Sequence, residues 1–156
     1  MPKKLEVFLN KTLKLSNVLI REVDESELGD IEKIAALMEA YMKSKGSNAI
    51  GPLIQYTNVS VRRDGVADIR VSMLMQANKY INHIESPYKI QSVHRIKNCL
   101  YLRFVGTEYN LKYAYDKLKL FAYEEDVQLV GDNYTIFMDS DNDTITADIF
   151  MEYIAH

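Results

Sequence analysis

The sequence repeats itself at a nearly constant interval, and this repeat constrains the fold more than any other feature. Three short matches occur in the same order at offsets of 80 or 81 residues. Asn17–Ile20 matches Asn98–Tyr101, and Ala67–Ile69 matches Ala147–Ile149. Between them, the pair Gly51 and Tyr56 matches the pair Gly131 and Phe137. Each match alone is weak, but three in one order at one interval predict a duplicated structural unit.

The hydrophobic pattern predicts the same elements in each half of the chain. Apolar residues recur at helical spacing from residue 28 to about 44 and again from about 109 to 124. Extended segments are predicted before and after each helix, at 17–22, 53–58 and 67–75, and at 90–94, 99–105, 134–139 and 144–153. We therefore predict one α+β domain over residues 1–156. It consists of two βαββ repeats, at about 5–77 and 88–156, joined by a polar linker at about 78–87.

Composition and charge exclude several classes of protein. The 156 residues suit one domain, and 47% hydrophobic with 26% charged residues is typical of a soluble globular chain. No apolar run approaches the ~18 residues of a membrane span, and Met1–Glu6 lacks the features of a secretory signal, so we expect a cytoplasmic protein that does not bind membranes. A net charge of −3 without a basic block argues against nucleic acid as a direct partner. The expected partners are small molecules or proteins.

The single cysteine and the three histidines do not indicate a reactive or metal site. Cys99 has no intramolecular disulfide partner and lies in an apolar run, which favours a buried, inert thiol. The histidines have no spacing that would bring two imidazoles to one metal: His83, His94 and His156. We predict no metal and no cofactor.

Residues Asp139–Asp143 resemble the start of a calcium-binding loop, with oxygen ligands at alternating positions. Thr144 stands where the EF-hand needs glycine and Phe150 where it needs the bidentate glutamate. The segment is therefore predicted to be a polar hairpin turn.

The last predicted strand carries two carboxylates on one face. Alternation places Asp148, Phe150 and Glu152 on one side, opposite Ile149, Met151 and Tyr153. From alternation alone a solvated strand face is favoured over a binding surface.

Tyrosine usage favours a pocket, since the chain has 11 Tyr and no Trp. Aromatic residues fall on the predicted strands at Tyr56, Tyr101, Tyr134 and Phe137. Rings around a carboxylate attract organic cations, and neutral aromatic ligands would also fit.

Three segments resemble the GyrI-like domain, also called the effector-binding domain of bacterial multidrug-responsive transcription activators. Gly51–Tyr56 resembles its Gly-Pro-x-x-x-Tyr segment, and Leu100–Leu118, with Gly106 and Tyr109, resembles its strand, glycine, tyrosine and helix. Thr146–Met151 resembles its terminal Thr-x-Glu-Ile-Tyr-Ile-Pro strand. The resemblance covers nearly the whole chain.

This resemblance implies a pseudo-twofold pair of βαββ units that form a concave antiparallel sheet, with the helices on one side and a ligand cleft between the repeats. In the family the acidic residue of the last strand binds cationic, often aromatic, drugs among tyrosines. Asp148 takes the acidic position, and Phe150 follows on the same face. Tyr56 takes the first-half tyrosine position and Phe137 the second-half one. Tyr101 and Glu152 complete the predicted ligand-binding set.

The chain departs from the family pattern at three of these positions. Asp148 is one methylene shorter than the usual glutamate, Phe137 lacks a tyrosine hydroxyl, and Glu152 stands where the family often has proline. The specificity of the family therefore does not transfer. The first sixteen residues are too few for a helix-turn-helix, so the chain resembles a stand-alone binding domain without a DNA-binding domain.

Three functions are compatible with the sequence. The leading hypothesis is a small-molecule binder acting in regulation or sequestration, with Asp148 as the charged floor of its site. The second is a hydrolase of reactive electrophiles, with Asp148 as general base and Tyr56 or Tyr101 orienting water. The third is an interaction protein without a small ligand, whose partner would be a regulator or DNA gyrase.

Overall fold

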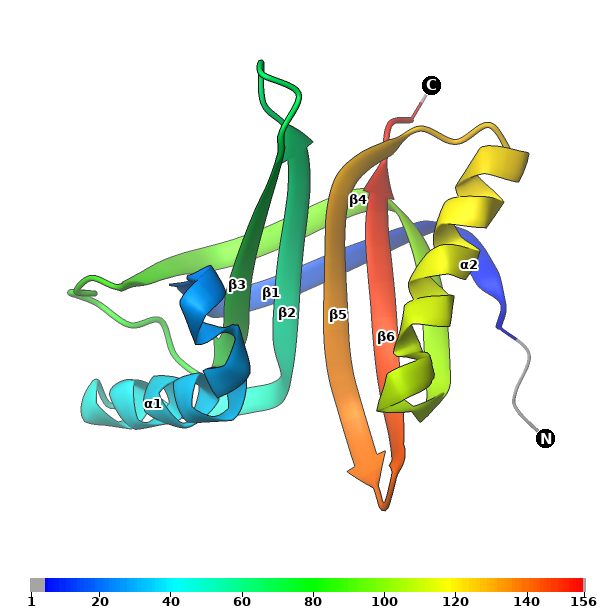
Figure 1. Ribbon diagram of the computed structural model, residues 1–156. Coiled ribbons are helices and arrows are strands. Elements are labelled where there is room, and N and C mark those ends of the chain that lie inside the picture. The colour runs from blue at the N-terminus through cyan, green and yellow to red at the C-terminus, as the bar shows by residue number, and fades with distance from the viewer. Residues whose placement is uncertain (1–4, 156) are drawn as a thin grey trace. The chain divides into compact units, whose positions relative to one another are not determined.

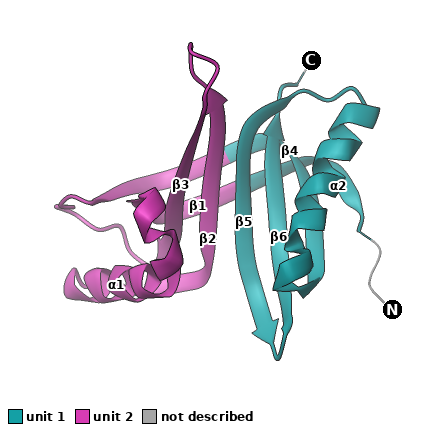
Figure 2. Cartoon of the chain, in the orientation of Figure 1, with its two compact units in different colours: residues 1–13, 96–156 teal, residues 14–95 magenta. Residues whose placement is uncertain are grey.

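Two long strands, β1 (Val7–Val23) and β4 (Tyr88–Thr107), each contribute residues to both of the compact units into which the chain divides. The computed structural model describes residues 5–155, and Met1–Lys4 of the N-terminal segment and His156 lie outside them. Unit 1 contains residues 1–13 and 96–156, and unit 2 contains residues 14–95 (Figure 2). The predicted repeats at 5–77 and 88–156 do not share these boundaries, because unit 1 includes the start of β1 from the first repeat and unit 2 includes the start of β4 from the second.

Unit 2 is a βαββ unit with antiparallel strands. Its elements after β1 are the 3₁₀ helix η1 (Glu25–Asp30), α1 (Ile31–Ser44), β2 (Ala49–Val61) and β3 (Ala67–Ala77) (Figure 1). β3 pairs with both β1 and β2. α1 buries one stripe at a four-residue spacing, Ile34, Met38 and Met42, against apolar side chains of β1 and β3.

Unit 1 has the same order of elements. The end of β4 is followed by η2 (Glu108–Asn110), α2 (Leu111–Glu124), β5 (Leu129–Asp141) and β6 (Thr144–Tyr153). β6 pairs antiparallel with both β4 and β5, and α2 lies against one face of these strands (Figure 1). The core between helix and strands contains Leu100, Leu102, Leu118, Ile149 and Met151, all nearly inaccessible to solvent.

The predicted α+β fold with two βαββ units is confirmed, whereas several strands are longer than predicted. The predicted segments 90–94 and 99–105 form the single strand β4, and the predicted segment 17–22 is the end of β1. In both strands an asparagine with positive φ, Asn17 at 49° and Asn98 at 59°, interrupts the regular pattern without ending the strand. Each of the two asparagines is the first residue of its segment in the first sequence match, Asn17–Ile20 with Asn98–Tyr101. In the described part of the chain, neither helix has the length and apolar character to span a membrane.

Strand pairing corrects the other two sequence matches. Gly51 and Gly131 both have positive φ and both lie at a register shift. Counting from these glycines, Tyr56 corresponds to Ile136, one residue before Phe137. Tyr56 pairs with Ser72 and Ile136 pairs with Asp148.

The structural counterpart of Asp148 in unit 2 is therefore Ser72, and the match with Asp68 is coincidental. The offset changes because residues 62–66 connect β2 to β3, whereas only Asn142 and Asp143 connect β5 to β6. A further register shift between Phe137 and Asp139 adds to the difference. The predicted polar turn after Asp139 lies at this connection.

Candidate functional site

Asp148 lies near the middle of β6, on the face opposite the core of unit 1. Its cross-strand partners are Arg103 on β4 and Ile136 on β5. Alternation places Tyr101 and Phe150, which are cross-strand partners of each other, on the same face. Alternation along β6 places Asp148 on one face of the sheet, and the strand register then shows which residues of β4 lie on that face beside it.

The carboxylate of Asp148 accepts three hydrogen bonds from β4. Arg103 donates from Nε to Oδ1 at 2.8 Å and from Nη2 to Oδ2 at 3.0 Å. The Tyr101 hydroxyl donates to Oδ1 at 2.8 Å. The Asp148 side chain is only 11% exposed, whereas that of Arg103 is 53% exposed. A buried carboxylate is therefore covered by a guanidinium that is itself accessible to solvent.

The charged and polar groups of this cluster stabilise one another. The hydrogen bond to Asp148 raises the pKa of the Arg103 guanidinium above its ordinary value. Burial raises the pKa of the Tyr101 hydroxyl, and the hydrogen bond that it donates to Asp148 adds to the effect. Tyr101 therefore remains a protonated donor at neutral pH. The carboxylate of Asp148 thus binds one cationic group, the guanidinium of Arg103.

Aromatic rings flank the ion pair. The Tyr101 and Phe150 ring centroids are 5.0 Å apart with an interplanar angle of 39°. Phe8, near the start of β1, places its ring centroid 6.0 Å from that of Tyr101 and is 43% exposed. The Lys11 ammonium lies 5.6 Å from the Phe8 ring centroid. These rings supply apolar surface beside the carboxylate, as expected of a site for an aromatic ligand.

The structure brings some of the predicted site residues together and separates others. Tyr101, Asp148 and Phe150 are in contact through the interactions above, and Glu152 follows them on the same face of β6. Burial, together with the nearby carboxylate of Asp132, raises the pKa of Glu152. Ligand binding by these residues remains a prediction.

Phe137 and Tyr56 do not join this cluster in unit 1. Phe137 pairs with Ala147, which places it on the opposite face of the strands from Asp148. Tyr134, the cross-strand partner of Phe150, lies on the Asp148 face and is 4% exposed. Tyr56 belongs to unit 2, where it pairs with Ser72.

Sequence reasoning missed Arg103 and Phe8. Arg103 stands two residues after Tyr101 in a strand, and this spacing was a usable signal that both side chains share a face. Phe8 had no such signal, because the strand predicted at 17–22 extends back to Val7 in the structure.

Cys99 does not take part in the site chemistry. Its side chain is fully buried, and burial raises the pKa of its thiol to about 11. Within residues 5–155 no three potential His, Cys, Asp or Glu ligands are grouped as a metal site would require.

Comparisons with known proteins indicate similarity of fold. The sequence matches no known family profile and no curated protein. Its structure is similar to EcmrR in a complex with DNA, with a TM-score of 0.71 and 16% identity over 96% of this chain. The match covers 57% of the EcmrR chain, so this chain spans little more than half of that protein.

Two other similar structures are matched over nearly their whole length. One is a hydrolase from Listeria innocua, with a TM-score of 0.59, 11% identity, and coverage of 98% of this chain and 93% of that one. The other is SAV2435 bound to tetraphenylphosphonium, with a TM-score of 0.52, 8% identity, and coverage of 98% and 95%. The TM-scores support a shared fold, and sequence identities this low leave the activity of this chain to be argued from its own residues.

Proposed function

We propose that this chain is a small-molecule binding protein whose ligand is an aromatic organic cation held by Asp148. In the bound state the cation replaces the Arg103 guanidinium on the carboxylate, and the rings of Tyr101, Phe150 and Phe8 contact its apolar part. The observation that carries the proposal is the asymmetry of the ion pair. Asp148 is nearly buried and fixed by three donors, whereas Arg103 reaches it from solvent.

Exchange of Arg103 for a ligand is energetically accessible. Ion pairs between exposed side chains contribute about 0.2–1 kcal/mol because water and salt screen the charges, and the half-exposed Arg103 guanidinium is open to the same screening. An aromatic cation replaces the same Coulomb interaction and adds contacts between its rings and the aromatic side chains, worth about 0.5–1.5 kcal/mol for each pair. Tyr101 keeps its hydrogen bond to Asp148 throughout the exchange and so holds the carboxylate in place.

The same geometry favours binding over hydrolysis. A general base needs a lone pair that faces the substrate water and a pKa near the working pH. Both oxygens of Asp148 already accept hydrogen bonds, one from the Tyr101 hydroxyl and two from the Arg103 guanidinium, so the carboxylate is occupied by internal donors where a general base would have to face the substrate water. The proposal therefore assigns Asp148 and Tyr101 to binding, and turnover of an electrophile that Asp148→Asn abolishes would contradict it.

We further propose that the chain is a GyrI-like effector-binding domain. The doubled βαββ fold, the glycine-containing bulges at Gly51 and Gly131 and the acidic residue of the last strand support this assignment. SAV2435, a protein of the same fold, binds tetraphenylphosphonium, which is an aromatic cation of the proposed class. In this role ligand binding would serve regulation or sequestration in the cytoplasm.

Calorimetric titration and thermal shift with tetraphenylphosphonium test the proposal, with neutral triphenylphosphine oxide as the comparison compound. A cation present at 100 times its Kd stabilises the native state by about 2.7 kcal/mol, or roughly 5–10 °C for a chain of this size. Asp148→Asn should abolish this shift. Asp116→Asn, an exposed aspartate on α2, is the matched control and should retain it.

Two outcomes would contradict the proposal. Equal binding of the cation and the neutral oxide would remove the role of charge, and binding that Asp148→Asn leaves unchanged would remove the role of the site. If no compound in a wider panel of cations and neutral aromatics binds, the interaction-protein hypothesis, with a regulator or gyrase as partner, takes precedence.

A further inference from the structure

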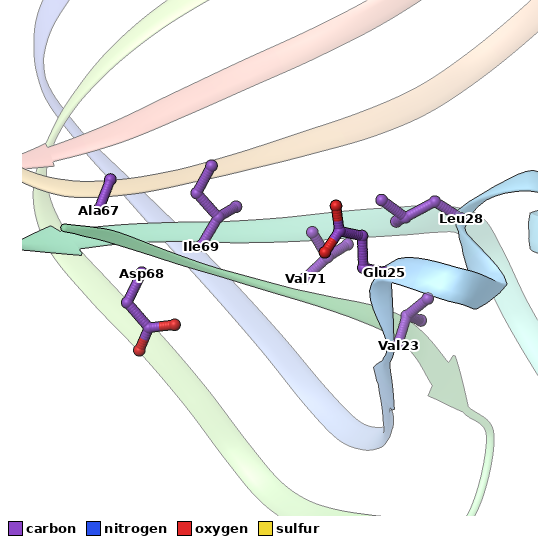
Figure 3. A pocket seen from close by; sticks show the side chains of 7 residues that line it. All are labelled: Val23, Glu25, Leu28, Ala67, Asp68, Ile69 and Val71. Carbon is purple, nitrogen blue, oxygen red and sulfur yellow. The ribbon is translucent and has the colours of Figure 1, made fainter.

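A pocket of about 360 Å³ lies entirely within unit 2, between η1 and the first residues of β3 (Figure 3). Its apolar lining includes Val23, Leu28, Ile69 and Val71. Leu28 is 43% exposed and Ile69 is 62% exposed, so apolar surface is presented to solvent. A concave volume of this size is at the lower end of the range for sites that hold small molecules.

Two carboxylates, those of Glu25 and Asp68, are among the residues that line this pocket. Figure 3 shows its carboxylate beside Val71 and Leu28, whereas Asp68 points to the other side of β3 from Ile69. Among residues 5–155, no hydrogen bond or ion pair is found for the Glu25 side chain.

The neighbouring carboxylates differ from Glu25 in this respect. Asp68 forms an ion pair with Arg70, with 3.6 Å between Oδ2 of Asp68 and Nε of Arg70. Glu27, two residues after Glu25, is held by Arg21 at 2.6 Å. Glu25 is thus the carboxylate of the pocket that remains available to a cation from solution.

Unit 1 fills the equivalent place with its own side chain. Phe104 corresponds to Val23, because the cross-strand partner of Phe104 is Ala147 and that of Val23 is Val71. The Phe104 ring packs over Gly106, so closely that a Cβ on Gly106 would lie 2.9 Å from Cζ of the ring. The ring is 5% exposed and belongs to the core of unit 1.

Three substitutions between the repeats account for the open pocket in unit 2. Where unit 1 has the cross-strand pair of Phe104 and Ala147, unit 2 has the pair of Val23 and Val71. Both valine side chains are short and end close to the strands. Glu25 stands two residues after Val23, and Gly106 has the equivalent position two residues after Phe104. Unit 2 therefore lacks the aromatic ring that unit 1 places here, and it carries a carboxylate where unit 1 has no side chain.

We propose that this pocket binds a small arylalkyl ammonium compound, with its ring between Val23, Leu28 and Ile69 and its ammonium group on Glu25. The ring takes the place that Phe104 occupies in unit 1. The ammonium group gains a carboxylate that lacks an internal partner. This site is independent of Asp148, and either can exist without the other.

Titration with 4-phenylbutylammonium, followed by amide chemical shifts in ¹H–¹⁵N spectra, tests the proposal. Two compounds with the same carbon skeleton, neutral 4-phenylbutanol and anionic 4-phenylbutanoate, report the contribution of charge. The ammonium compound should shift the amides of residues 23–28 and 67–71 and bind more tightly than the alcohol. Asp148→Asn should leave these shifts unchanged, which separates this site from the one in unit 1.

Substitutions in the pocket complete the test. Glu25→Gln keeps the shape and removes the charge, and it should weaken ammonium binding about fivefold, the effect of losing one solvent-screened ion pair. The triple variant V23F/E25G/V71A copies the packing of unit 1 and should abolish binding. Ile69→Lys changes an exposed residue, places an internal ammonium near Glu25 and should abolish binding without a change in the core.

Three results would overturn the proposal. Equal affinity for the ammonium compound and the alcohol would exclude a role for Glu25. Binding that persists in Ile69→Lys, or in a folded triple variant, would place the ligand elsewhere. Shifts confined to unit 1 would show that the compound binds only there.

Discussion

Replacing Arg103 by methionine distinguishes an internal competitor for the ligand from a permanent part of the binding surface. Methionine keeps much of the apolar stem of arginine and removes the guanidinium. If Arg103 occupies the position that the ligand cation takes, its removal leaves Asp148 open. The affinity for an aromatic cation should then rise, although a hydrogen-bonded residue has been lost.

The size of the effect follows from the exposure of the two side chains. Arg103 makes two hydrogen bonds to Asp148 but is 53% exposed, so solvent screening reduces the contribution of the pair to about 1 kcal/mol. A ligand that no longer displaces this partner gains the same amount, or roughly fivefold in Kd. The free protein loses stability, because the nearly buried carboxylate retains only its bond from Tyr101. We expect a cost of about 1–2 kcal/mol.

Calorimetry with tetraphenylphosphonium measures the affinity, and urea unfolding without ligand measures the stability. We expect tighter cation binding and a lower free energy of unfolding in Arg103→Met, with no change in the binding of triphenylphosphine oxide. Added salt should weaken cation binding in the variant more than in the wild-type protein, because the ligand then provides the sole cation at Asp148. Unchanged or weaker cation binding in a folded variant would refute the exchange of Arg103 for the ligand.

Three other predictions concern residues of unit 1 outside the candidate site. Leu118→Ala should lower the free energy of unfolding by about 2–5 kcal/mol because Leu118 is fully buried, whereas Leu120→Ala on the exposed side of the same helix should change it by less than about 0.5 kcal/mol; urea unfolding measures both. Gly106→Ala should cost about 1–3 kcal/mol, because its Cβ would meet the Phe104 ring, and combining it with Phe104→Val should recover part of the loss; equal costs in the single and double variants would contradict this contact. Burial raises the pKa of the Cys99 thiol to about 11, so at pH 8 its thiolate fraction should be about a hundredfold below that of the unfolded chain, and a thiol reagent should react slowly until denaturant is added. Since the raised pKa favours the neutral thiol in the folded state, its contribution to stability is complete below about pH 9 and falls as the pH rises toward 11. Rapid labelling of the native protein at pH 8 would contradict this assignment.

The sequence was sufficient to predict the fold class because its main signals are local. The apolar stripes from residue 28 to 44 and from 109 to 124 describe helices that the structure contains as α1 and α2. The last strand was predicted at 144–153 and is found there. Alternation within that strand correctly separates Asp148 from Ile149 and Met151, which pack against α2.

The site was only partly predictable because its contacts depend on strand register. Arg103 meets Asp148 only if β4 and β6 pair in one particular register, and alternation within a strand does not specify that register. The same limit explains Phe137, since one residue of displacement moves a side chain to the other face. Asp68 shows a related effect: its local sequence matches that of Asp148, but a longer turn gives it a different position in the strand.

The division of β1 and β4 between the two units has a consequence for fragments of the chain. Residues 7–13 of β1 belong to unit 1, where Leu5 and Val7 pack on the core and Asn10 hydrogen-bonds the Tyr153 hydroxyl. Residues 88–95 of β4 belong to unit 2, where Tyr88 stacks on Tyr41.

A cut in the connection at 78–87 would therefore leave neither fragment with a complete unit. The N-terminal fragment would contain most of unit 2 without its β4 segment, and the C-terminal fragment would contain most of unit 1 without the strand that carries Phe8. The two pieces should fold efficiently only when present together, as in complementation of a split protein. Ligand binding at Asp148 would then report reassembly, because its aromatic surroundings come from both fragments.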